Sequence, residues 1–233
     1  MLEAPVEGFE AISLILIVVG HEAAHFLLRH NDRRVPEEES LAEKRSLEMW
    51  ADSFGTKLAL TLVTYGASTG AAAAPFLVEV SLKQRLEAIG RAIGRLGESY
   101  FDTGSPHHPD APTRVGMCVT GVTSFLDIEL KSRVPKRSLW VMLRLYDNPA
   151  MEAMMAHTDE SYLSDRSPIE MMAAVHREIQ GEDGAIRPGV SPWMVRFVNL
   201  NFAVDPDERR RHVQAMEVFL ERELAALFAG DAA

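Results

Sequence analysis

The sequence contains very little cysteine and carries fewer basic than acidic residues. Its one cysteine, Cys118, cannot form an internal disulfide or a thiolate metal site, so a bound metal would need histidine and carboxylate ligands. Lys and Arg number 24 against 34 Asp and Glu, which gives a formal net charge of −10. Because a uniformly acidic chain repels phosphate backbones, we expect no nucleic-acid partner. The lone thiol and the lack of a basic signal-peptide start predict a cytoplasmic location.

The alternation of apolar and polar residues that is typical of strands is nowhere convincing, whereas apolar residues recur at helical spacing. Hydrophobic residues make up 47% of the chain, enough for a substantial core. A charged stretch at 132–136 predicts a metallopeptidase-like unit at 1–130 and a helical region at 131–233 that either stands apart or belongs to the same domain. The pattern predicts a mainly α fold with helices at residues 10–29, 41–62, 77–96, 114–128, 138–146, 149–156, 168–180, 192–201 and 206–229.

Two apolar stretches are candidate membrane spans. Residues 12–19 are too short to cross a bilayer and run directly into a His-Glu pair. Residues 58–78 are long enough and uncharged, but Gly66, Gly70 and Pro75 favour a buried small-residue helix that breaks near 66–70. Membrane association therefore stays an alternative that the sequence does not favour.

The chemistry of the chain is concentrated in an H-E-x-x-H motif, His21-Glu22-Ala23-Ala24-His25, within a strong helical pattern. Positions four apart on a helix differ by about 40° around its axis, so both imidazoles leave one face a single turn apart. Two such nitrogens can bind one zinc ion. Glu22 lies beside this face, where its carboxylate can take a proton from an attacking water and pass it to a leaving amine. A polar cluster satisfied by its neighbours is the alternative.

A third ligand must come from elsewhere in the chain. His30 is five residues after His25, roughly 140° around the helix, and so cannot easily share the metal. The better candidate is Glu48, on a second helix that can return antiparallel to the first, with Gly55 allowing a close approach. Asp52, one turn beyond Glu48, is placed to accept the other ring N–H of a ligating histidine. An exposed acidic pair on a surface helix is the alternative.

These residues resemble a known signature. H-E-A-A-H-F-L-L-R-H followed by E-M-W-A-D-S-F-G is similar to the gluzincin zinc metallopeptidases, which carry H-E-x-x-H and a later E-x-x-A-D. Within that group the chain looks most like the M48-type peptidases and the Lit-like peptidase U49 family of phage-exclusion proteins. A third element, residues 105–114, resembles the family's H-P-x-x-x-x-R motif, with His108, Pro109 and Arg114 in register.

The resemblance implies a zinc ion held by His21, His25 and Glu48, with Glu22 as general base and Asp52 behind the ligands.

Two further residues receive expected roles from the third element. His108 can donate a hydrogen bond to the oxyanion of the tetrahedral intermediate. Arg114 either pairs with an acidic group, fixing the loop on the site, or holds a substrate carboxylate. An exposed His-His-Pro turn followed by an ordinary arginine is the alternative.

One feature departs from the family pattern. Zincin peptidases usually bind substrate as an added strand against a sheet edge upstream of the active-site helix, and roughly ten residues precede that helix here. We therefore expect either a shortened form or a cleft built from helices, a partner chain or later loops.

The expected function is that of a zinc metalloendopeptidase-like hydrolase that acts on protein or peptide substrates through a metal-activated water, with Glu22 as general base. The resemblance also implies a phage-defence or stress setting. Two alternatives stay open. One is a zinc-stabilised helical scaffold or interaction protein without turnover, and the other is a membrane-associated M48-type quality-control protease anchored by residues 58–78.

Overall fold

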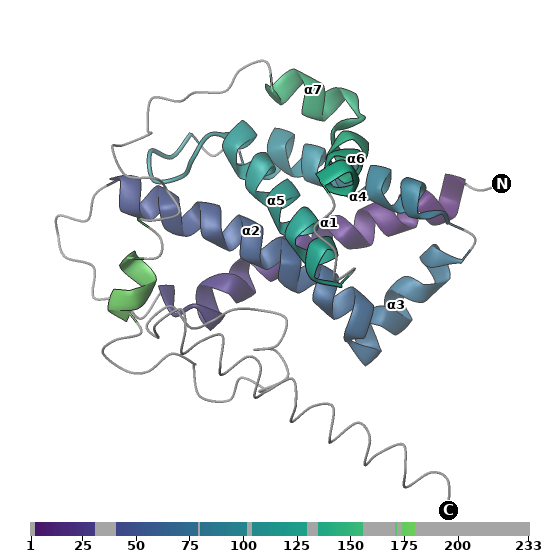
Figure 1. Ribbon diagram of the computed structural model, residues 1–233, viewed down its shortest axis with the longest axis horizontal. Coiled ribbons are helices and arrows are strands. Elements are labelled where there is room, and N and C mark those ends of the chain that lie inside the picture. Colours follow the sequence, from purple (N-terminus) through teal and green to yellow (C-terminus); the bar gives the residue numbers. More distant parts are fainter. Residues whose placement is uncertain are drawn as a thin grey trace, which may run out of the picture.

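A computed structural model of the chain describes residues 3–30, 41–78, 80–101, 104–129, 135–155, 171 and 174–179. No strand occurs in these ranges, so the predicted mainly α class is confirmed. Residues 174–179 are helical as well. The predicted helices at 192–201 and 206–229 lie outside the described residues. The elements are α1 (Glu3–Leu27), α2 (Leu41–Tyr65), α3 (Ala67–Leu77), α4 (Leu82–Leu96), the π-helical turn η2 (Gly97–Phe101), α5 (Ala111–Glu129), α6 (Pro135–Tyr146) and α7 (Pro149–Met155) (Figure 1).

The start predicted for the helix at residues 77–96 is wrong. The chain forms the separate helix α3, and α4 begins only after Ser81. Ser81 caps α4 because its hydroxyl accepts from the backbone N–H of Gln84, while the Gln84 side chain accepts from the backbone N–H of Ser81. This S-x-x-Q capping box is visible in the sequence and marks the true start of the helix.

The predicted break near residues 66–70 is confirmed. Gly66 has φ −78° and ψ 121°, an extended conformation that ends α2 at Tyr65 and lets α3 start in a new direction. Residues 58–78 are therefore divided between two helices. Among the described residues, one helical stretch, Gly8–Leu27 of α1, is long and apolar enough to cross a membrane by length and composition, a property that core helices share.

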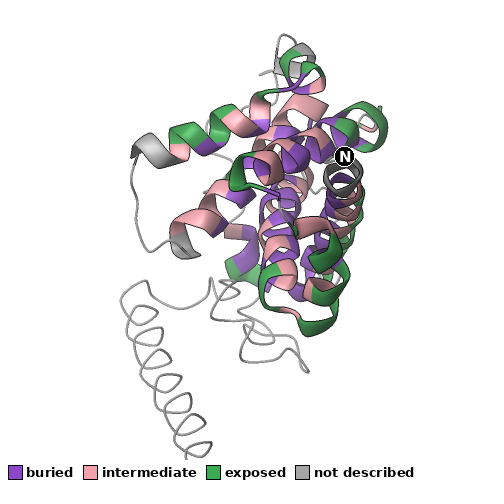
Figure 2. Cartoon of the chain, turned by 90° about the vertical axis from the view of Figure 1, so that its right-hand side faces the viewer, coloured by how far each residue is buried: buried purple, intermediate pink, exposed green. Residues whose placement is uncertain are grey.

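Helix α2 packs against both α1 and α5, and α1 also packs against α4 (Figure 1). Buried residues gather where these helices face one another, and exposed residues lie on the outer faces (Figure 2). One cluster joins α1 and α2 next to the H-E-x-x-H motif, through Ala24, Leu28, Ala51, Phe54 and Leu58. The larger cluster joins α1, α4, α5, α6 and α7, and its members include Phe9, Ile17, Ile89, Ile93, Val115, Val122, Leu145 and Met151.

The described part of the expected second region, residues 135–155, thus shares a core with the first. Helices α6 and α7 pack against α4 and α5, and Val141, Leu145 and Met151 are buried there.

Two glycines bring the motif helix close to α2. A Cβ on Gly20 would overlap the carbonyl oxygen of Gly55, and a Cβ on Gly55 would lie 2.5 Å from the backbone nitrogen of His21. The helix backbones therefore touch at this crossing, and the predicted close approach at Gly55 is confirmed. The contact places the first histidine of the motif directly against α2.

Candidate metal centre

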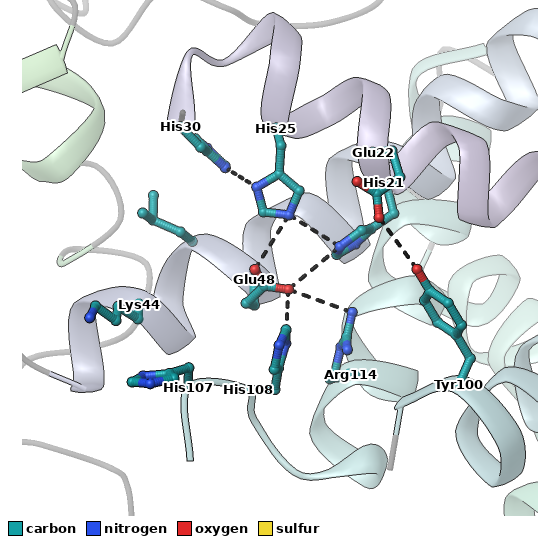
Figure 3. A pocket seen from close by; sticks show the side chains of 11 residues that line it. His21, Glu22, His25, His30, Lys44, Glu48, Tyr100, His107, His108 and Arg114 are labelled. Carbon is teal, nitrogen blue, oxygen red and sulfur yellow. Dashed lines mark hydrogen bonds and ion pairs between the residues drawn. The ribbon is translucent and has the colours of Figure 1, made fainter. Parts of the chain in front are cut away.

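Three side chains from α1 and α2 converge on one point (Figure 3). His21 and His25 lie one turn apart on α1, and their Nε2 atoms are 3.1 Å from each other. Across the helix interface, the carboxylate of Glu48 places Oε2 3.5 Å from Nε2 of His21 and Oε1 3.4 Å from Nε2 of His25. The structure thus brings together the three residues that the sequence predicted as ligands.

The three side chains lie close enough for a single tetrahedral ion to contact all of them. Zinc binds nitrogen and oxygen at about 2.0–2.1 Å, and the edge of a tetrahedron is about 1.6 times the bond length, so neighbouring ligand atoms lie roughly 3.3 Å apart. The two imidazole nitrogens are 3.1 Å apart, each lies 3.4 or 3.5 Å from a different oxygen of Glu48, and one donor atom from each of the three residues lies within 4.8 Å of the others. Two imidazoles and one carboxylate are a zinc donor set that leaves a fourth position open for water or substrate.

The pKa values of His21 and Glu48 depend strongly on the charges of the neighbouring side chains in this cluster. Burial opposes the protonated form of His21, but Asp52 and Glu48 outweigh it and raise the pKa of His21 to about 9. Burial likewise opposes ionisation of Glu48, but His21, His25 and His108 lower its pKa to about 2. The metal-free site is therefore an imidazolium–carboxylate pair at neutral pH, and a bound cation would replace the proton of His21.

A buried ion pair lies behind the first histidine. Oδ1 of Asp52 is 2.8 Å from Nδ1 of His21, although this nitrogen has no aligned hydrogen-bond partner. Arg114 donates two hydrogen bonds to Asp52, from Nε at 2.8 Å and from Nη2 at 2.9 Å, and it packs 4.2 Å over the ring of Phe101. Arg114 also lies 3.7 Å from Glu48. It thus has the first of its two expected roles, that of pairing with an acidic group.

His108 reaches the site from the 104–110 loop. Its Nδ1 lies 3.2 Å from Oε2 of Glu48, so the ring contacts this carboxylate and also lines the cleft. The loop is fixed to α2 because Nε of Arg45 donates to the carbonyl oxygen of Pro106 at 2.9 Å. In this position His108 steadies the Glu48 carboxylate.

The site opens into a cleft of about 550 Å³. Its walls come from α1, α2, η2, the 104–110 loop and α5, and no strand borders it in the described part of the chain. Glu22 is exposed at this cleft, and the hydroxyl of Tyr100 donates to its Oε1 at 3.3 Å. The lining residues are His21, Glu22, His25, His30, Lys44, Leu47, Glu48, Tyr100, His107, His108 and Arg114.

Neither Tyr100 nor His176 was predicted from the sequence. Tyr100 lies on the π-helical turn η2, which aims its hydroxyl at Glu22 and which no motif in the sequence indicates. His176 is 146 positions from His30, yet the Nε2 atoms of the two rings are 2.7 Å apart. The signal available for His176 was a lone histidine at helical spacing, which by itself predicts nothing.

A scan against protein-family models, a search of characterised proteins and a search of solved structures each returned no match.

Proposed function

We propose that this protein is a zinc-dependent metallopeptidase whose substrate, a protein or peptide, binds in the helix-walled cleft. One observation carries the proposal. One donor atom from each of His21, His25 and Glu48 lies within 4.8 Å of the other two, close enough for the three to share one ion, and the Glu22 carboxylate stands beside them in the same cleft.

His21, His25 and Glu48 would hold the zinc ion, which when bound polarises the scissile carbonyl and lowers the pKa of a water. Glu22 follows His21 directly and faces the cleft, so its carboxylate can accept the proton of the attacking water and deliver it to the leaving amine. The hydrogen bond from Tyr100 restricts the Glu22 carboxylate to the cleft side of α1.

The surrounding groups orient the ligands. The Asp52 carboxylate beside Nδ1 of His21 favours a proton on that nitrogen and leaves Nε2 free for the metal. Arg114 neutralises Asp52, so the carboxylate is buried as one half of an ion pair. His108 contacts Glu48 and also lines the cleft, where its ring can approach the carbonyl oxygen of a bound peptide.

The test compares the zinc-loaded wild type with Glu22→Gln on a broad peptide library. Glutamine keeps the shape of the side chain but cannot accept a proton, so we expect hydrolysis to fall by about 100-fold or more. Zinc content should stay at one ion per chain because Glu22 is not a ligand. Glu98→Gln, on η2 but outside the cleft lining, is the matched control and should retain activity.

Two results would refute the proposal. One is Glu22→Gln with wild-type activity. The other is a zinc-loaded wild type that hydrolyses no peptide in the library, which would support the scaffold alternative.

A further inference from the structure

Three histidine rings form a continuous chain that leads away from the proposed zinc site. Nδ1 of His25 lies 2.9 Å from Nδ1 of His30, and Nε2 of His30 lies 2.7 Å from Nε2 of His176. His30 contacts His25 at Nδ1, whereas Glu48 lies near the other ring nitrogen, Nε2 (Figure 3). His30 is 7% exposed and His176 is fully buried, so water cannot readily replace either contact.

Two local features build this chain. Arg29 has a positive φ of 63°, which ends the helical path of α1 and turns His30 back toward His25. The short helical segment 174–179, drawn green in Figure 1, is attached to α2 because Val175 and Ile179 pack on Leu47. Leu47 precedes Glu48 directly, so the segment that carries His176 is packed on the same turn of α2 as the carboxylate ligand.

The facing nitrogens restrict where the protons lie. Each close pair of ring nitrogens can share one proton, because two N–H groups would repel and two lone pairs would leave no bond. A metal on Nε2 of His25 requires the His25 proton on Nδ1, which then donates to Nδ1 of His30. The His30 proton must then lie on Nε2 and donate to Nε2 of His176. Burial lowers the pKa of His176 to about 4, so this ring is a neutral acceptor at pH 7.

We propose that His176 is a positioning residue of the metal centre, which acts through His30 to keep the proton of His25 on Nδ1 and its Nε2 free for zinc. The inference rests on the proposed zinc site and adds a contribution from residues 174–179 to it. Without the acceptor at 176, the N–H of His30 would be buried and unsatisfied. His30 would then favour its other tautomer, which places the His25 proton on the nitrogen that binds the metal.

The variants that test this proposal differ in whether residue 176 can accept a hydrogen bond from the Nε2–H group of His30. His176→Leu fills similar space without an acceptor, whereas the amide of His176→Gln reaches the same position. Ile179→Ala weakens the packing of the same segment on Leu47 but keeps the histidine, and serves as the matched control. Zinc affinity is measured by competition with a chromophoric chelator on the full chain.

We expect His176→Leu to bind zinc about 10- to 100-fold more weakly than the wild type, the usual cost of losing a group that orients a ligand. His176→Gln and Ile179→Ala should stay within about threefold of the wild type, since each keeps an acceptor near His30. Wild-type affinity in His176→Leu would overturn the inference. Equal losses in His176→Leu and Ile179→Ala would also overturn it, because packing alone would then explain the effect.

A second measurement needs no variant. Long-range ¹H–¹⁵N correlation spectra of the zinc-loaded wild type report which ring nitrogen of each histidine carries the proton. The expected pattern is Nδ1–H for His25, Nε2–H for His30 and Nδ1–H for His176, and Nδ1–H on His30 would overturn the inference. Failure of the wild type to bind zinc would instead refute the proposed function, so the two failures are distinguishable.

Discussion

Raising the pH of the metal-free protein through 9 should destabilise it, because His21 then loses its proton. Burial opposes the imidazolium, but Asp52 at 2.8 Å and Glu48 at 3.5 Å raise its pKa from the ordinary 6.5 to about 9. A folded-state pKa above the unfolded value gives stability that is fully present below pH 6.5 and is lost as the pH rises through 9. At roughly 1.4 kcal/mol for each unit, the loss amounts to about 3 kcal/mol.

Zinc affinity should change with pH in the opposite direction to the stability of the metal-free protein. Nε2 of His21 must lose its proton before it can bind the metal, so zinc affinity should rise by about tenfold for each pH unit between 7 and 9. Saturating zinc therefore adds more to the free energy of unfolding as the pH rises from 7 to 9. Over the same range the free energy of unfolding of the metal-free protein falls.

Urea denaturation at pH 6.5 to 9.5, with chelator and with zinc, measures both effects. His21→Gln is the matched control and should lack the alkaline loss of stability, since it has no proton to release. The reasoning would be refuted if the chelator-treated wild type were as stable at pH 9.5 as at 6.5. The same fall in His21→Gln would refute it as well.

Three further substitutions test the residues that position the groups of the site. Arg114→Met should cost about 3–5 kcal/mol in urea denaturation, because the buried Asp52 carboxylate loses both hydrogen bonds from the guanidinium; a cost under 1 kcal/mol would contradict this. Gly55→Ala should cost about 1–3 kcal/mol through overlap at the helix crossing, whereas Gly116→Ala, with open space around it, should be neutral or stabilising. Equal effects at the two glycines would be inconsistent with the crossing. Tyr100→Phe should lower kcat about 2- to 10-fold with zinc content unchanged, by removing the hydrogen bond to the general base; unchanged kcat would argue against this role.

The part of the site that could be predicted from the sequence is the part carried by helical geometry. The spacing of His21 and His25 places both rings on one face, and the small residue at Gly55 indicates where a second helix can approach. Glu48 and Asp52 follow from the same periodicity once α2 is taken as that helix. Each of these inferences needs only contacts within a helix or between two consecutive helices.

The rest depends on contacts that periodicity does not encode. Tyr100 reaches Glu22 through a π-helical turn, which shifts its side chain away from the direction that regular α-helical spacing gives. His176 meets His30 across 146 positions, through tertiary packing on Leu47. The angle between His25 and His30 on an ideal helix predicts only that the two rings diverge, whereas the positive φ of Arg29 decides that His30 contacts Nδ1 of His25.

The most direct test of the central proposal is elemental analysis of the purified chain after dialysis against zinc and removal of the excess. We expect one zinc ion per chain for the wild type, and almost none for His25→Ala and Glu48→Ala, with both variants still helical by circular dichroism. A wild type that takes up no zinc would contradict the account. Alanine variants that retain a full equivalent would contradict it too.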